Sequence, residues 1–197
     1  VVDPDVSINL LNNSGINIGE TYIQNSINDP LGASFNNIGS LKIIYFKKPE
    51  SGNYKLLISS SNNNTYLVDG YLYDINGDVE KGSFTGVVGN NNSDTYLINF
   101  DKDNSNNSSA NQEVTFRSLK NDIKTFYSLG KIKKAAFKNL LLLQVDLAEK
   151  LSTKSKIASR ALLMVMRSEI QKEKGKSITN DAANILLDEL NVLISQF

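Results

Sequence analysis

Residues 101–126 read DKDNSNNSSANQEVTFRSLKNDIKTF, and the chain changes its character within this stretch. The first eleven residues contain no apolar side chain except Ala110, so burial there cannot offset the entropy cost of ordering the backbone. Four apolar residues then recur at spacings of 3, 4 and 3, which is the period of an amphipathic helix. They are Phe116, Leu119, Ile123 and Phe126. The stretch therefore predicts a polar linker at residues 104–112 and a helical domain at residues 113–197.

Before residue 104 the apolar residues alternate with polar ones at a period of two, which is typical of strands. Val6, Ile8 and Leu10 follow this alternation, and Asn76-Gly77 is a strong hairpin signal because both residues tolerate positive φ. About seven short strands without interleaved helices predict an antiparallel β-sandwich domain at residues 1–103. The clearest strands are expected at residues 6–10, 41–46, 54–58, 66–73, 83–88 and 95–100.

After residue 113 the period of 3.6 continues and predicts a bundle of about four helices. One helix follows Gly130, another covers residues 154–173, and Ser177 or Thr179 is positioned to cap the last. Four successive leucines at 140–143 make the second helix apolar around most of its circumference, so we expect it to lie centrally. The predicted bundle core consists of Leu140, Leu143, Leu147, Leu186, Leu190 and Leu193. The predicted fold class is α+β, an N-terminal antiparallel β-sandwich followed by a C-terminal helical bundle.

The chain contains no His, no Cys and no Trp, while 26 of its 197 residues are Asn. His and Cys are the commonest groups that titrate or attack near neutral pH. No nucleophile is paired in sequence with a base, and no Gly-rich phosphate loop follows a strand. We therefore expect a protein that is not an enzyme, with no catalytic, cofactor-binding or metal-binding residues. No apolar run approaches the roughly 20 residues of a membrane-spanning helix.

The two parts of the chain carry opposite net charges. Residues 1–112 hold 6 Lys and Arg against 12 Asp and Glu, and residues 113–197 hold 15 against 9. Such charges favour an attractive interface between the parts, and they equally keep each part soluble. Lysines cluster at Lys131, Lys133, Lys134 and Lys138. They are not interleaved with the Arg or aromatic residues that are typical of nucleic-acid binding. We expect no nucleic-acid partner.

Two acidic segments are candidates for calcium binding. The predicted linker matches a calcium-loop template at Asp101, Asp103 and Ser105, but it lacks the Gly at the sixth position and the Glu at the twelfth. The segment from Asp74 to Asp78 is also acidic, yet a hairpin turn explains each of its residues. We expect no tight metal site, and a weak calcium site at the Asp74–Asp78 turn stays open.

Four tyrosines, Tyr66, Tyr71, Tyr73 and Tyr96, fall in the predicted strands. Exposed aromatic side chains on one sheet face would stack on sugars, whereas tyrosine is also a common packing residue at sheet edges. Their exposure therefore decides between a glycan-binding module and a structural sandwich. The candidates for paired catalytic carboxylates have no informative spacing and are expected at the surface. They are Asp69, Asp74, Asp78, Asp188 and Glu189.

The C-terminal part carries two short Gly-containing marks. Gly130-Lys131-Ile132 precedes a long helix, and the stretch from Gly175 reads GKSITNDAANILLDELNVLI, with Ala182-Ala183 inside it. On these marks, residues 117–196 resemble the FIMAH-type helical domain found at the ends of multi-domain secreted bacterial proteins. The resemblance implies a helical module without catalytic residues.

The N-terminal part is similar to prepeptidase-C-terminal-like β-sandwich modules. The matching stretches are Asp3-Pro4-Asp5, residues 30–34 (PLGAS) and residues 49–58 (PESGNYKLLI), followed by residues 71–74 and 76–77. Gly52, Tyr54 and Leu56 supply the Gly-x-Tyr-x-Leu strand start that those modules share. The chain departs from them in its heavy Asn content.

These patterns predict a non-catalytic accessory region of a larger extracellular or cell-surface bacterial protein, which supports or docks a neighbouring functional domain. The expected partners are other domains of the same polypeptide or a surface protein. A glycan- or cell-wall-binding module is the alternative. The start at Val1-Val2-Asp3-Pro4, without Met, is consistent with a segment of a longer protein, and the absence of Cys is compatible with secretion.

Overall fold

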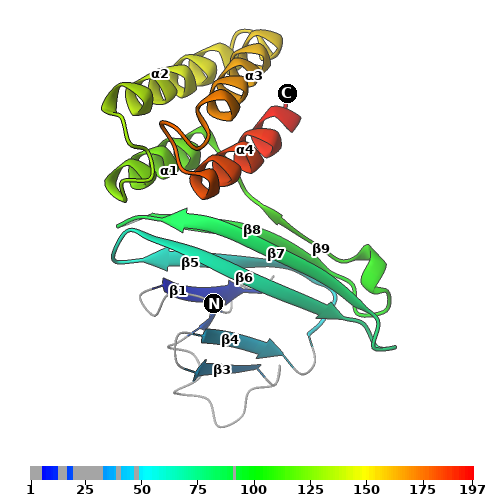
Figure 1. Cartoon of the computed structure of the whole chain (residues 1–197). Helices are drawn as coiled ribbons and strands as arrows, with labels where there is room; N and C mark the ends of the chain where they lie inside the picture. The colour runs from blue at the N-terminus through cyan, green and yellow to red at the C-terminus, as the bar shows by residue number, and fades with distance from the viewer. Residues whose placement is uncertain (1–5, 13–16, 20–32, 39–40, 47–48, 91) are drawn as a thin grey trace. The chain divides into compact units, whose positions relative to one another are not determined.

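The computed structural model describes residues 6–12, 17–19, 33–38, 41–46, 49–90 and 92–197. The chain divides into two compact units, residues 1–113 and residues 114–197. The first unit is built from strands and the second from helices (Figure 1), so the class is α+β as predicted. Asp3-Pro4-Asp5 and residues 30–32 of the PLGAS stretch lie outside the described residues.

Among its described residues, the first unit has one five-stranded sheet and two separate pairs of strands, and the named strands pair antiparallel to one another. The order in the larger sheet is β2-β1-β5-β8-β9. Its strands are β1 (Val6–Leu11), β2 (Asn17–Gly19), β5 (Gly52–Ser60), β8 (Ser93–Phe100) and β9 (Ser109–Gln112). The pairs are β3 (Ala33–Ile38) with β4 (Leu41–Phe46), and β6 (Asn64–Tyr73) with β7 (Val79–Val88).

Alternate residues of these strands meet in one apolar core. The buried cluster combines side chains of the larger sheet with side chains of β6 and β7: Val6, Ile8, Ile58, Tyr66, Val88 and Tyr96. Half-buried residues pack against it, namely Ile44, Leu56, Val68 and Phe84. Because separate sheets share this core, the unit has the sandwich-like architecture that the period of two predicts.

The Asn76-Gly77 hairpin is present between β6 and β7. The Asp74 amide donates to the Asp78 carbonyl at 3.0 Å, and the Gly77 amide donates to the Asp74 carbonyl at 3.1 Å. Gly77 has a φ of +86°, a conformation that costs residues with a Cβ. The turn fixes the register, in which Tyr73 faces Val79.

The polar segment at residues 104–112 differs from the predicted linker. It contains the 3-10 turn η2 (Ser105–Asn107) and strand β9, which pairs with β8, and it belongs to the first unit. Hydrogen bonds order it in place of apolar burial. The Ser105 amide donates to the Asp74 carboxylate at 3.0 Å, and the Ser108 hydroxyl accepts the Asp101 amide at 2.9 Å. The chain then divides after Glu113.

Residues 114–197, which the structure describes without a gap, form four helices as predicted. They are α1 (Phe116–Ser128), α2 (Ala135–Ser152), α3 (Lys156–Glu173) and α4 (Asn180–Ser195). Helix α2 packs on α1 and α3, and α4 packs on the same two helices. Thr179 is the N-cap residue of α4, although its side chain makes no capping hydrogen bond. Over the described ranges, no helix combines the length and apolar character needed to cross a membrane.

Two loops of the bundle are joined to each other. Ile132, after α1, forms an antiparallel bridge with Ile178, before α4, and both side chains are fully buried. The Thr179 amide donates to the Lys131 carbonyl at 2.9 Å. The Lys131 ammonium also pairs with Asp181 at 2.5 Å. The two Gly-containing sequence marks thus lie side by side.

The predicted core is correct for α4 and wrong for α2. Leu186, Leu190 and Leu193 are buried, whereas Leu140, Leu143 and Leu147 are 41%, 56% and 42% exposed. The buried residues of α2 lie one position further along: Phe137, Leu141, Gln144, Val145 and Ala148. Because leucines surround this helix, their spacing alone does not reveal which stripe faces inward.

Candidate interaction surfaces

The contacts of α2 show which of its edges faces each neighbour. Lys120 of α1 pairs with Asp146 at 3.0 Å and with Glu149 at 2.7 Å, so this edge of α2 lies against α1. On the other edge, the Gln144 amide nitrogen donates to Glu169 of α3 at 2.6 Å. The inward stripe of α2 lies between these two edges.

The exposed leucines lie beyond the α3 edge. Leu140 and Leu143 directly precede the inward residues Leu141 and Gln144, which places them about 100° around the helix from those residues. Turning around α2 from the inward residues to these leucines passes Gln144. The leucines therefore lie on the α3 side of the helix, away from α1. Leu147 continues the same stripe at a spacing of four. Three leucines therefore form a continuous apolar edge beside α3.

Helix α3 extends this apolar surface. Val165 is half exposed and lies four residues before Glu169, which contacts Gln144, so Val165 is on the side of α3 that faces α2. Leu162, one turn earlier, is partly buried. We call the combined surface the α2–α3 face. Its apolar members are Leu140, Leu143, Leu147, Leu151, Leu162 and Val165.

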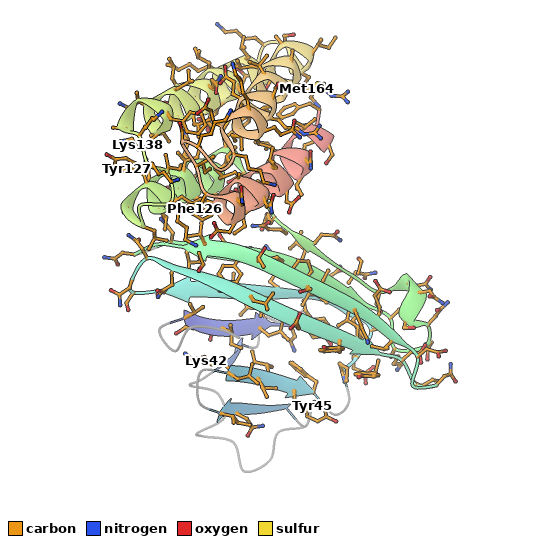
Figure 2. All side chains as sticks on the ribbon, viewed as in Figure 1. Lys42, Tyr45, Phe126, Tyr127, Lys138 and Met164 are labelled. Atoms are coloured by element: carbon orange, nitrogen blue, oxygen red, sulfur yellow. The ribbon has the colours of Figure 1, made fainter. Side chains whose placement is uncertain are left out.

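Met164 lies outside this face. It directly precedes Val165, so it points about 100° away around α3. Its side chain is half exposed, and Figure 2 labels it on α3. Met164 therefore provides an apolar residue of similar exposure for comparison with the α2–α3 face.

Lysines border the α2–α3 face. Lys150 lies three residues after Leu147 and seven after Leu143, and Lys172 lies seven residues after Val165, so both share the face. Both are exposed, as is Lys154 in the turn after α2. The acidic residues of α2 pair with Lys120 on the opposite edge, and Glu169 accepts a hydrogen bond from Gln144. The three lysines outnumber the two carboxylates on the α2 side of α3, Glu169 and Glu173, so the rim of the face carries a net positive charge.

The four predicted tyrosines divide between the two sides of the sandwich. Tyr66 and Tyr96 are buried in the core, whereas Tyr71 and Tyr73 of β6 are 54% and 58% exposed. The exposed pair lies two residues apart on one face of the strand. Lys81 of β7, opposite Tyr71 in the register, places its ammonium 5.6 Å from the Tyr71 ring centroid.

The sandwich core contains a buried polar cluster that is not predicted from the sequence. Asp94 is 6% exposed and accepts a hydrogen bond from the Tyr66 hydroxyl, whose oxygen lies 2.8 Å from that of Tyr96. Burial raises the pKa of Asp94 to about 6. The tyrosine ring covers Gly86 on β7, where any Cβ would overlap the Tyr66 hydroxyl. Extending the alternation of β8 back from Tyr96 to residue 94 would have pointed to this cluster.

The acidic turns use their carboxylates to hold backbone. One Asp74 oxygen accepts the amides of Asn76 and Asp78 at 2.9 and 3.0 Å, and the other accepts the Ser105 amide. These bonds, the Ser105 one foremost, lower the pKa of Asp74. The carboxylate of Asp101 accepts the Asp103 amide at 2.9 Å in the same manner. Within the described residues, no group of three or more His, Cys, Asp or Glu is arranged to hold a metal.

The remaining candidate charges are distributed over both units. Asp69, Asp78 and Asp188 are exposed as expected, but Asp74 and Glu189 are buried, which corrects their assignment to the surface. Of the lysine run, Lys131 pairs with Asp181. That pairing outweighs the effect of desolvation and lowers the pKa of Asp181 to about 2. Lys138 lies 4.5 Å from the Tyr127 ring centroid (Figure 2).

Comparison with known proteins does not identify a family for this chain. No protein-family model, no curated protein and no solved structure matches the chain.

Proposed function

We propose that this chain is a non-catalytic interaction region of an extracellular bacterial protein, and that its helical unit docks a protein segment through the α2–α3 face. The observation that carries this proposal is the exposure of Leu140, Leu143 and Leu147 along one edge of α2. Full burial of a leucine side chain is worth about 1.5–3 kcal/mol, and these three are about half exposed, so covering the edge supplies roughly half of that value for each leucine.

The chemistry of the chain supports a role without catalysis. The sequence lacks His and Cys, which most often serve as bases and nucleophiles near neutral pH. The titratable groups with shifted pKa values have structural partners. Asp94 is bound by a core tyrosine, and Asp74 holds backbone amides. The extracellular setting rests on the resemblance of residues 117–196 to terminal modules of secreted bacterial proteins.

Site-specific photo-cross-linking in the intact parent protein tests the docking role. A benzophenone side chain replaces Leu143 in one variant and Met164 in a second, matched variant. We expect position 143 to cross-link to one defined polypeptide segment, identified by mass spectrometry, and position 164 to give only background. The cross-link should also disappear when Leu147→Glu is added. Equal yields at the two positions would contradict docking through this face.

A glycan- or cell-wall-binding module is the second candidate, because Tyr71 and Tyr73 expose their rings on one face of β6. Exposed tyrosine rings stack on the apolar faces of sugars, because their apolar ring and polar hydroxyl suit a partly wet contact. Titration of soluble peptidoglycan fragments by calorimetry tests this role. Saturable binding that is lost in Tyr71→Ala and Tyr73→Ala supports it. Tyr45→Ala, at an equally exposed tyrosine of β4 (Figure 2), is the matched control.

A further inference from the structure

We infer that the occupant of the α2–α3 face is an amphipathic helix whose apolar stripe is flanked by Asp and Glu, an assignment that rests on the docking role proposed above. Three features of the described residues support this assignment. They are the shape of the seam between α2 and α3, the lysines around the seam, and the hydrogen bonds and ion pairs that the nearby acidic side chains already make.

The shape of the face suits a third helix. Leu140 to Leu151 spans twelve residues of α2, or about 16 Å, which corresponds to three helical turns. Across the seam, α3 presents the small residues Ala158 and Ala161 together with the partly buried Leu162. A partner helix can therefore pack along the leucine edge and across the small residues of α3.

The charge around the face selects the partner's flanks. Lys150 and Lys154 lie at the end where α2 turns into α3, and Lys172 lies toward the other end of α3. The acidic residues on the α2 side of α3 already have partners, since Glu169 accepts a hydrogen bond from Gln144 and Glu173, one turn further, accepts one from Ser177. A helix with Asp and Glu beside its leucines would pair with these lysines at both ends.

Two other occupants are less compatible with these features. A second copy of the chain would bring its own Lys150 and Lys172 against those of the first, which is a like-charge contact. An anionic membrane suits a basic face, but this face lacks the Trp and Phe that interfacial segments use beside Leu. The apolar members of the α2–α3 face are all Leu or Val, and the chain contains no Trp.

Fluorescence anisotropy with two synthetic peptides tests the inference on the full chain. Each labelled peptide has about 18 residues, the length of α2, with Leu at positions i, i+3, i+4 and i+7 of successive turns. One carries Glu on its flanks and the other Lys. We expect saturable binding of the Glu peptide, at least tenfold tighter than that of the Lys peptide.

Variants of the chain assign this binding to the face. We expect Leu143→Glu to weaken the Glu peptide at least tenfold, and Met164→Glu, the matched control on α3, to change its affinity less than twofold. The double variant Lys150→Glu/Lys172→Glu should reverse the preference, so that the Lys peptide binds more tightly. Circular dichroism verifies that each variant keeps the helical content of the parent chain.

Four results would overturn the inference. They are equal affinity for the two peptides, insensitivity of binding to Leu143→Glu, a dimer in sedimentation velocity that depends on Leu143, and Leu143-dependent binding to phosphatidylglycerol vesicles without peptide binding. The cross-linking experiment separates this failure from failure of docking itself. If position 143 cross-links to a partner segment while the Glu peptide does not bind, the docking role stands and the acidic-helix assignment is overturned.

Discussion

At the scale of single residues, the sandwich core contains a carboxyl group in an apolar setting. Asp94 lies among Tyr66, Tyr96 and the surrounding core, and the Tyr66 hydroxyl donates its hydrogen bond to it. Burial disfavours the charged carboxylate more strongly than this one hydrogen bond favours it, so the pKa of Asp94 rises from its ordinary value of 3.8 to about 6. In the folded state the protonated form of Asp94 therefore predominates below about pH 6.

This shift predicts a pH dependence of stability. Between pH 4 and pH 6 the folded chain binds more protons at Asp94 than the unfolded chain, so the free energy of unfolding falls as pH rises through this window. The loss is on the order of 3 kcal/mol, from a pKa difference of about two units. We expect Asp94→Asn to remove this fall, measured by urea unfolding at several pH values.

The exposed Asp69 supplies the control for this prediction, because Asp69→Asn changes the same functional group at the surface of β6. Its unfolding curve should keep the pH dependence of the parent chain. Parallel curves for the parent and Asp94→Asn would mean that Asp94 titrates normally.

At the scale of elements, α2 places two nearby leucines in opposite environments. Leu141 is fully buried, while Leu143 is more than half exposed. We expect Leu141→Ala to lower the free energy of unfolding by about 2–5 kcal/mol, the usual cost of a buried leucine truncation. Leu143→Ala should change it by less than about 0.5 kcal/mol, as surface substitutions do. Equal costs for the two variants would place α2 in a different rotation.

The same element shows what the sequence could and could not predict. The positions of the four helices follow from their apolar period, and the α4 stripe is correct because polar residues separate it from the opposite side. In α2 the run of leucines erases that contrast, and the inward position of Gln144 depends on Glu169, which is 25 residues away. Likewise, residues 104–112 are ordered by hydrogen bonds to Asp74 and Asp101. The linker prediction considered only the lack of apolar residues in the segment, so it missed these bonds.

At the scale of the whole molecule, each unit has its own buried core, one built from strands and one from helices. We expect two transitions in differential scanning calorimetry, because separate cores unfold independently. Leu141→Ala should lower the midpoint of one transition and leave the other in place. Gly86→Ala, which forces a Cβ into the Tyr66 hydroxyl, should lower the other. A single transition that both variants shift would show that the units unfold together.

The bridge between Ile132 and Ile178 has a consequence for variation among relatives of this chain. The two isoleucines are 46 positions apart, yet an antiparallel bridge pairs them and both side chains are buried. A larger side chain at one position fits only if the other becomes smaller, so the two positions should co-vary at nearly constant total volume. A pattern that pairs Gly130-x-Ile132 with Gly175-x-x-Ile178 should therefore identify related helical units more selectively than either short motif alone.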